Sequence, residues 1–238
     1  MTQNLYPDVV DFHSHVLPGA DHGSASVEDS TIQLKFAKNA GVTRIIATPH
    51  FYPHRHSVEK FLLRREKSYM MLKDSGLLDD APRVRLGSEV LLCENLHKLP
   101  GLSDLCIYGT NVILLELPFL DISDNHVKTV SKIMDMGLDV VLAHADKYER
   151  ADIERFIYIG ARLQVNADAF SSFFFKKPHL FDWIDRGDVV CLGSDIHGKN
   201  KTAYKFFSKA KKKIGNDLSY ICEKSNEIWD KSRDFSHE

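Results

Sequence analysis

Short apolar runs alternate along the chain with segments of helical period, and the alternation continues almost to the last residues. Seven runs rich in Val, Ile and Leu predict strands at residues 9–15, 43–50, 84–90, 112–117, 139–145, 162–167 and 189–195. Unbroken apolar stretches such as Val112 to Leu115 are typical of strands that are covered on both faces. The pattern therefore predicts an α/β fold built on parallel strands.

Helices are predicted between these strands, most clearly at residues 27–40, 125–136, 202–214 and 218–231. In the first of them, Ile32, Phe36 and Ala40 follow one another at a spacing of four residues. Ser26 and Asp29 stand at its start with the spacing of a capping box. No linker rich in Pro, Ser or Gly and no repeat divides the sequence, so we expect one barrel-like α/β domain over the whole chain, residues 1–238.

Composition excludes several classes of protein. Of the 238 residues, 43% are hydrophobic and 27% are charged, with a net charge of −2. This chain is too apolar to be disordered, and its mixed charge is not that of a nucleic-acid-binding protein. The first seven residues predict no secretory signal, and the longest apolar runs have four residues, whereas crossing a bilayer takes ~20. We expect a cytoplasmic protein without membrane insertion.

The four cysteines argue against one catalytic class. Cys93, Cys106, Cys191 and Cys222 form no CxxC pair and have no spacing typical of disulfides, which agrees with a reducing compartment. A cysteine phosphatase needs an arginine six positions after its thiolate to cradle the phosphate. Those positions hold Leu, Val, His and Ile, so that chemistry is excluded.

Histidines and carboxylates gather where the predicted strands end. His13 and His15 stand two residues apart at the end of the first strand, so their side chains point to the same face. Asp195 and His197 repeat this spacing after the last strand. Asp11 has the parity of the two histidines, and it is either a structural carboxylate or a group that orients one imidazole.

Four other strands end in a residue of the same kind, namely His50, Glu89, Glu116 and His144. Any one of them alone is more simply explained as a hydrogen-bonded polar residue. Together they would crowd charged and imidazole groups into one barrel mouth, which requires compensation by metal ions. Imidazole and carboxylate ligands without thiolate suit Mn, Zn or Fe better than Ca.

The chain resembles the polymerase and histidinol phosphatase (PHP) family of metal-dependent phosphoesterases, and within it the bacterial tyrosine phosphatases encoded with capsular and exopolysaccharide genes. The matching stretches are DFHSHVLPGADHG, ATPH, GSE, LLELP, LAH, QVN and GSDIH, in family order. The resemblance implies a distorted seven-stranded (β/α)7 barrel, similar to a TIM barrel, that holds three divalent ions, with Mn²⁺ expected and Fe or Zn as alternatives.

The resemblance also implies a ligand set. One ion would be held by His13, His15, Glu89 and Asp195, a second by His22, His50 and His197, and a third by Glu89, Glu116 and His144. Three divalent ions would outweigh the three carboxylates by about three charges, which favours a phosphate monoester dianion as substrate. Asp195 and His197 are the nearest candidates to assist the leaving group.

Two positions depart from the pattern of the tyrosine-phosphatase branch. Asp21 and His22 stand where the branch has two aspartates before a glycine, which leaves open which of the two is a ligand. Lys147 stands where the branch carries an arginine, and lysine binds phosphate as a point charge instead of a fork. Arg55 or Arg150 could supply the missing fork.

These residues lead to a first hypothesis and two alternatives. The first is a metal-dependent protein-tyrosine phosphatase that acts on the phosphotyrosine tail of a membrane-associated kinase controlling capsular or exopolysaccharide synthesis. The second is a phosphatase of small molecules, of the histidinol-phosphate type. The third is a non-catalytic regulator that binds a kinase. The sequence leaves the oligomeric state open.

Three further features each have two explanations. A basic stretch forms either a solvated helix face or a guide for an anionic tail, and it comprises Lys199, Lys201, Lys205, Lys209, Lys211, Lys212 and Lys213. A phenylalanine cluster is either core or a stacking surface for a phosphotyrosine ring, and it comprises Phe170, Phe173, Phe174, Phe175 and Phe181. His54 and His56 either touch substrate or are exposed loop residues.

Overall fold

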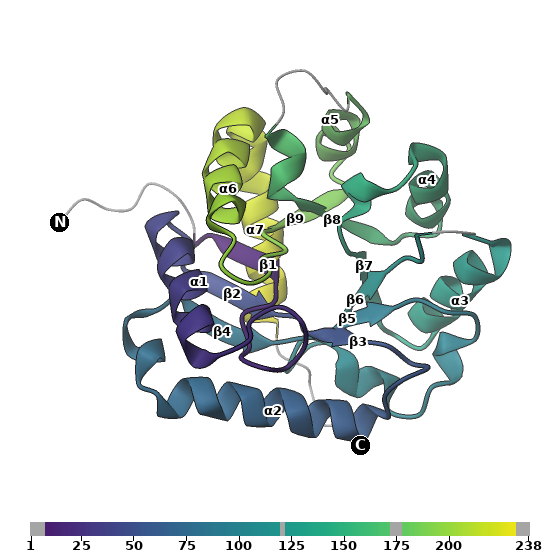
Figure 1. Cartoon of the computed structure of the whole chain (residues 1–238). Coiled ribbons are helices and arrows are strands. Elements are labelled where there is room, and N and C mark those ends of the chain that lie inside the picture. The colour runs from purple at the N-terminus through teal and green to yellow at the C-terminus, as the bar shows by residue number, and fades with distance from the viewer. Residues whose placement is uncertain (1–7, 120–121, 172–177, 232–238) are drawn as a thin grey trace.

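Two parallel sheets form the centre of the computed structural model, which describes residues 8–119, 122–171 and 178–231. The first sheet has the order β1 (Val10–Ser14), β2 (Arg44–Ala47), β4 (Arg83–Leu86). The second has the order β3 (His50–Phe51), β5 (Glu89–Leu91), β6 (Val112–Glu116), β7 (Asp139–Leu142), β8 (Arg162–Asn166), β9 (Val189–Gly193). Figure 1 shows the sheets around one interior, with most of the helices outside.

All seven predicted runs form strands, but the count of seven strands in one barrel is not confirmed. Within the described residues, the runs at 43–50 and 84–90 are each broken into two strands, which gives nine strands in two sheets. The first break falls at Pro49, which has no N–H to continue a ladder. Before the break the Thr48 amide donates to Ser14, and after it the Pro49 carbonyl accepts from Glu89.

The predicted helices are present as α1 (Val27–Asn39), α3 (Asp124–Asp135), α6 (Lys201–Ile214) and α7 (Leu218–Asp230). The Ser26 side chain caps α1 by accepting from the Asp29 amide, as the capping-box spacing predicts. Three further helices were not specified by the pattern, namely α2 (Val58–Asp74), α4 (Arg150–Tyr158) and α5 (Pro178–Asp185).

The longest of the unspecified helices, α2, has polar residues within its buried stripe. Val58, Phe61, Arg65, Ser68 and Leu72 are buried at the spacing of one helical face. The Arg65 guanidinium donates to the Gly87 carbonyl at 3.1 Å, and the Ser68 hydroxyl donates to the Pro18 carbonyl at 2.6 Å. The two polar members interrupt the apolar pattern in the sequence while fixing the loops that lead into the site.

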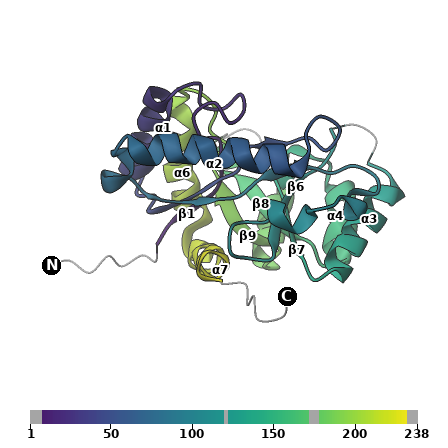
Figure 2. The ribbon, with the colours of Figure 1, turned by 90° about the horizontal axis from the view of Figure 1, so that it is seen from below.

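The two ends of the interior differ. At the amino ends of the strands, α7 packs against β1 and β9, and its Trp229 joins Val10, Val112 and Val190 in one buried cluster. We call this end the floor; Figure 2 shows α7 there. The opposite end is called the mouth: His15 follows β1 there, Glu116 ends β6 and Asp195 follows β9, and Glu89 at the start of β5 lies beside them. No helix in the described parts of the chain is long and apolar enough to cross a membrane.

Candidate metal centre

The first group of converging side chains joins the two ends of the chain at the mouth. The Nε2 atoms of His13 and His15 lie 3.2 Å apart, and the Asp195 Oδ1 atom lies 3.8 and 3.5 Å from them. His13 lies near the end of β1, His15 directly follows this strand, and Asp195 follows β9. The Asp195 amide donates to the His13 carbonyl at 2.8 Å, which ties the two segments together.

A bulge decides the orientation of Asp11, which shares the sequence parity of the histidines. The register of β1 against β2 shifts between Asp11 and Ser14. The Asp11 carboxylate accepts from the Ser194 amide at 2.8 Å and from the Tyr204 hydroxyl at 2.7 Å, and these bonds link β1 to the last loop and α6. It also accepts from the backbone amide of His13 at 3.4 Å, so the hydrogen bonds of this carboxylate go to two amides and one hydroxyl and not to an imidazole ring.

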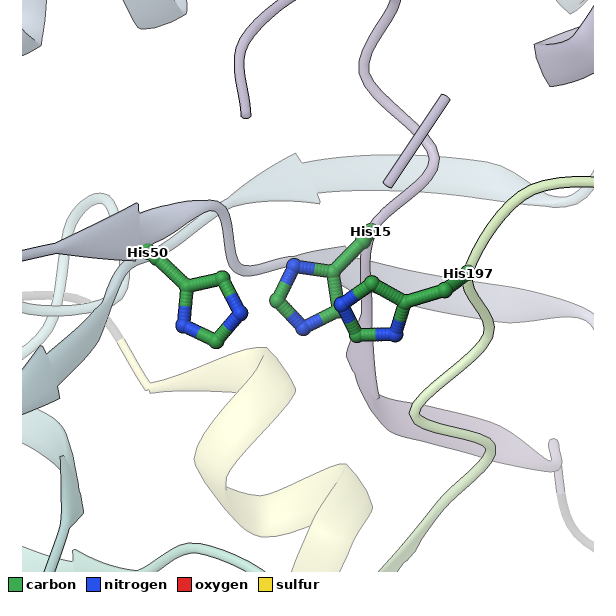
Figure 3. Close-up of side chains that lie close together, drawn as sticks. All are labelled: His15, His50 and His197. Atoms are coloured by element: carbon green, nitrogen blue, oxygen red, sulfur yellow. The ribbon is translucent and has the colours of Figure 1, made fainter. Parts of the chain in front are cut away.

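The second group consists of the imidazoles of His15, His50 and His197, which Figure 3 shows turned toward one another from three segments. The His15 ring centroid lies 4.5 Å from that of His50 and 4.0 Å from that of His197. Burial and the neighbouring His15 lower the pKa of His197 to about 4. A neutral imidazole is the form that can bind a metal ion.

The two candidate ligands Asp21 and His22 take different positions at the mouth. The Asp21 carboxylate lies 2.7 Å from the Nδ1 atom of His15, and it also accepts from the His50 amide at 3.0 Å. Burial alone would raise the pKa of Asp21, but the bond to His15 holds it well below its usual range. The His22 ring lies beside the group, 4.7 Å from that of His50 and 4.8 Å from that of His197.

The third group is centred on Glu89, which is buried at the start of β5. Its Oε1 atom lies 2.8 Å from the Nε2 atom of His144, whose ring also approaches Glu116 at 3.6 Å. Its Oε2 atom lies 3.1, 3.3 and 2.9 Å from ring nitrogens of His13, His15 and His50. Glu89 is thus shared by residues of all three groups.

The charges at the mouth favour ionised carboxylates. Burial alone would raise the pKa of Glu89, but the surrounding imidazoles hold it well below its usual range. Asp195 is held low in the same way by His13 and Lys147 against the effect of burial. Burial lowers the pKa of His144, but bonds to Glu116 and Glu89 outweigh this and raise it to about 9.

Several buried polar atoms of this cluster make no hydrogen bond within the described chain. They are Glu89 Oε2, His50 Nδ1, His144 Nδ1 and His197 Nε2. Leaving buried polar groups unpaired costs about 1–3 kcal/mol each, and more for charged groups. Three sets of ligand atoms each lie within 4.8 Å, namely His15, His50 and His197; His13, His15 and Asp195; His50, Glu89 and Glu116. The donor set and its unpaired atoms fit divalent metal ions.

The predicted phosphate-binding residues lie at different distances from the cluster. Lys147 ends a short 3₁₀ turn, Ala145–Lys147, and its ammonium donates to the Asp195 Oδ2 atom at 2.7 Å. Arg55 is exposed, with its guanidinium 5.4 Å above the ring of Tyr52. Arg150 forms ion pairs with Asp182 at 3.0 Å and Glu154 at 3.4 Å. Of the three cations, only Lys147 directly contacts a candidate ligand.

Two aromatic residues at the mouth were missed in the sequence. Phe119 is 67% exposed, and its ring lies nearly parallel to that of His144, with centroids 6.4 Å apart. Tyr52 stacks on His50 at 5.4 Å. Each follows a strand-end candidate by two or three residues, and this spacing is the signal that could have identified them.

The remaining features lie away from the ligand atoms. Phe170 is buried and meets Phe181 edge to face, while Phe173, Phe174 and Phe175 lie outside the described residues. His54 and His56 lie within 6.3 Å of the Tyr52 ring, on its own loop. Within the basic stretch, Lys199 pairs with Asp29 at 3.0 Å. The four cysteines all lie within the described residues, and they form no disulfide with one another.

Comparison with known proteins places this geometry in context. The putative tyrosine-protein phosphatase CapC of Staphylococcus aureus is 27% identical over 146 residues, which are 58% of this chain and 54% of that protein. The tyrosine-protein phosphatase YwqE of Bacillus subtilis strain 168 is 22% identical over 232 residues, 92% of this chain and 91% of that protein.

A solved structure shows the same fold. It is described as one of YwqE from Bacillus subtilis and CpsB from Streptococcus pneumoniae, unique metal-dependent tyrosine phosphatases. It superposes with a TM-score of 0.77 at 22% identity and covers 95% of this chain and 96% of that chain. The likeness shows a mixed α/β fold with parallel strands.

The sequence profile described as capsular polysaccharide synthesis, CpsB/CapC, matches residues 9–226. The matched segment includes every candidate ligand, from His13 to His197. It confirms the predicted resemblance to the bacterial proteins encoded with capsular genes. The chain belongs to the CpsB/CapC family of capsular polysaccharide synthesis.

Proposed function

We propose that the chain is a metal-dependent protein-tyrosine phosphatase. The observation that carries the proposal is the buried Glu89 carboxylate, whose Oε2 atom faces three imidazoles without a hydrogen bond to any of them. Such a cluster is compensated by divalent ions, and phosphomonoester hydrolysis is a reaction that closely spaced ions support. The names of the relatives, tyrosine-protein phosphatases, supply the substrate class.

The proposed ligand sets follow the three groups. His13, His15, Glu89 and Asp195 would hold one ion, His22, His50 and His197 a second, and Glu89, Glu116 and His144 a third, with Mn²⁺ expected. When bound, these ions would neutralise phosphate oxygens and lower the pKa of water toward ~7. Asp21 would orient the His15 ring, because its carboxylate hydrogen-bonds to the Nδ1 atom and leaves the Nε2 atom for the metal ion.

The chain's own residues would bind and orient the substrate. Lys147, beside Asp195, places a positive charge where the phosphate would enter, and Arg55 would reach it from the loop after β3. Phe119 offers an exposed ring next to His144 against which an aromatic leaving group could stack. Asp195 and His197 would assist departure of the phenolate.

The proposed cellular role is based on membership of the CpsB/CapC family. The substrate would be the phosphotyrosine tail of a membrane-associated kinase that controls capsular or exopolysaccharide synthesis, and the reaction would take place in the cytoplasm. We further propose that residues 1–238 act as one PHP-type domain, whose two sheets function as a single distorted barrel around the mouth.

The test compares two substrates on one metal-loaded protein. The purified chain is stripped with a chelator, reloaded with Mn²⁺, and offered a phosphotyrosine peptide or histidinol phosphate. We expect Mn²⁺-restored turnover with a higher kcat/KM for the peptide. A preference for histidinol phosphate would favour the small-molecule alternative. Absence of restored turnover with either substrate would overturn both enzymatic hypotheses and favour the kinase-binding regulator.

A further inference from the structure

Strand β8 delivers amides to the mouth, where the other strand ends deliver histidines and carboxylates. Gln164 and Asn166 stand two residues apart near its end, and both side chains are buried, with 0% and 2% exposure. Neither carries a charge, and neither was a candidate ligand. Their hydrogen bonds nevertheless reach both His13 and Asp195, which belong to the first ligand group.

The Gln164 amide has a defined orientation because one of its partners can only donate. The backbone N–H of His144 lies 2.7 Å from the Oε1 atom, so this atom must be the carbonyl oxygen. The Nδ1 atom of His13 lies 3.0 Å from the same oxygen, and it can bond there only as a donor. His13 therefore carries a proton on Nδ1, and its Nε2 atom faces the Glu89 Oε2 atom at 3.1 Å.

The other end of the Gln164 amide determines the orientation of Asn166. The Gln164 Nε2 atom donates to the Asn166 Oδ1 atom at 2.9 Å, so the Asn166 amino group faces away from Gln164. This group donates to the Asp195 Oδ2 atom at 3.0 Å. The other Asp195 oxygen, Oδ1, then faces the Nε2 atoms of His13 and His15.

The backbone around these amides is strained and tightly packed. His144 and Asp195 are non-glycine residues with φ of +34° and +48°, and each is bonded by one member of the pair. A Cβ atom at Gly193 would lie 2.6 Å from the Gln164 Nε2 atom and 2.6 Å from the His13 Cβ atom. Glycine at this position allows β9 to pack against the pair.

We propose that Gln164 and Asn166 are positioning residues that hold His13 and Asp195 in the orientation needed to bind one metal ion. This proposal rests on the metal centre of the proposed function and assigns a role to residues outside its ligand set. His15 is oriented by a carboxylate, Asp21, whereas His13 is oriented by a neutral amide. The amide fixes the tautomer without adding negative charge, so the mouth keeps its attraction for a phosphate dianion.

Three variants separate the two arms of this hydrogen-bond chain. Gln164→Leu removes both arms, Gln164→Glu keeps an acceptor for His13 but loses the donor to Asn166, and Asn166→Ala removes only the arm to Asp195. The matched control is Asn226→Leu, because the Asn226 amide is half-buried and bonds to Arg44, Asp8 and Cys222 at the floor. The measured quantities are the Mn²⁺ Kd and the ring ¹⁵N shifts of His13 in the metal-free protein.

We expect Gln164→Leu to raise the Mn²⁺ Kd by about 10–100-fold, which is typical for loss of a group that orients a ligand. Asn166→Ala and Gln164→Glu should fall between this variant and the wild type. The Nδ1–H signature of His13 should persist in Gln164→Glu and be lost in Gln164→Leu. Asn226→Leu should lower the melting temperature while its Mn²⁺ Kd stays that of the wild type.

The outcomes distinguish this proposal from the proposed function. A wild-type protein that binds no Mn²⁺ would overturn both. A wild-type protein that binds Mn²⁺, together with unchanged affinity in Gln164→Leu and Asn166→Ala, would overturn only the positioning role. A His13 imidazole without a proton on Nδ1 in the wild type would also overturn it, whatever the affinity.

Discussion

The floor and the mouth both bury charge, but they compensate it differently. At the floor, the Arg44 guanidinium contacts Asn226 at 2.7 Å, Asp8 at 2.8 Å and Asp230 at 3.1 Å, although its Nε atom makes no hydrogen bond. At the mouth, the Glu89 Oε2 atom meets imidazoles without a hydrogen bond. At the floor, the buried charge is compensated by other residues of the chain, whereas at the mouth it needs a bound ion. This difference distinguishes a charge that stabilises the fold from one that serves a binding site.

The largest effect should follow from neutralising the shared carboxylate. Glu89→Gln keeps the shape of the side chain but removes the charge that residues of all three ligand groups approach. We expect kcat/KM for a phosphotyrosine peptide to fall by about 10²–10³-fold, the scale seen when one charge-stabilising group is lost. Steady-state kinetics at saturating Mn²⁺ measures it. Activity within about 10-fold of the wild type would contradict the role of the mouth.

The corresponding change at the floor should affect stability alone. Trp229 is 6% exposed in the buried cluster, so Trp229→Ala should lower the free energy of unfolding by about 3–5 kcal/mol. Denaturant unfolding measures this loss, and kcat/KM per folded molecule should be unchanged below the transition. Trp229→Phe, which keeps most of the volume, serves as the milder control. Lost activity with unchanged stability would contradict the separation of the two ends.

Metal binding should stabilise the protein through the mouth. At Mn²⁺ about 100-fold above its Kd, linkage adds about 2.7 kcal/mol per site. For a chain of this length this corresponds to a rise of roughly 5–10 °C in melting temperature. Calorimetry with and without a chelator should show the rise in the wild type and in Trp229→Ala. An equal rise in Glu89→Gln would disprove the assignment of Glu89.

The sequence identified the strands well because buried parallel strands are continuous apolar runs. It also predicted that histidines and carboxylates from distant segments come together, because the end of such a strand is a fixed place in the fold. The sequence could not show where one apolar run is divided into two strands that pair in different sheets. The breaks at Pro49 and Gly87 split two runs between the sheets, and the bulge after Asp11 separates that carboxylate from the histidines of equal parity.

The sequence also did not predict the roles of buried polar residues that hold the structure together. Arg65 and Ser68 stand in the buried face of α2, where an apolar pattern was needed to specify the helix. Gln164 and Asn166 carry no charge, so they stood out neither as ligands nor as core residues. Their roles depend on hydrogen bonds across more than 20 residues of sequence, and only the packed structure shows these bonds.

A pair of lysines gives the finest comparison between the two ends. Lys147 bonds to Asp195 beyond β9 at the mouth, and Lys231 bonds to Asp139 at the start of β7 at the floor. Lys147→Ala should raise KM for the peptide about 10-fold, because a hydrogen bond to a charged group contributes at least ~1.5 kcal/mol. Lys231→Ala should change stability by less than about 1 kcal/mol and leave the kinetics unchanged.

A third variant distinguishes charge from geometry at the mouth. Lys147→Arg restores the fork that other members of the branch are expected to carry, so it should lower KM below that of the wild type without raising kcat more than about 3-fold. If Lys147 only stabilises Asp195, arginine and alanine should both weaken Mn²⁺ binding and leave KM at saturating Mn²⁺ unchanged. A rise in KM in the alanine variant alone would instead place the lysine on the substrate, which is the role that its position beside the cluster predicts.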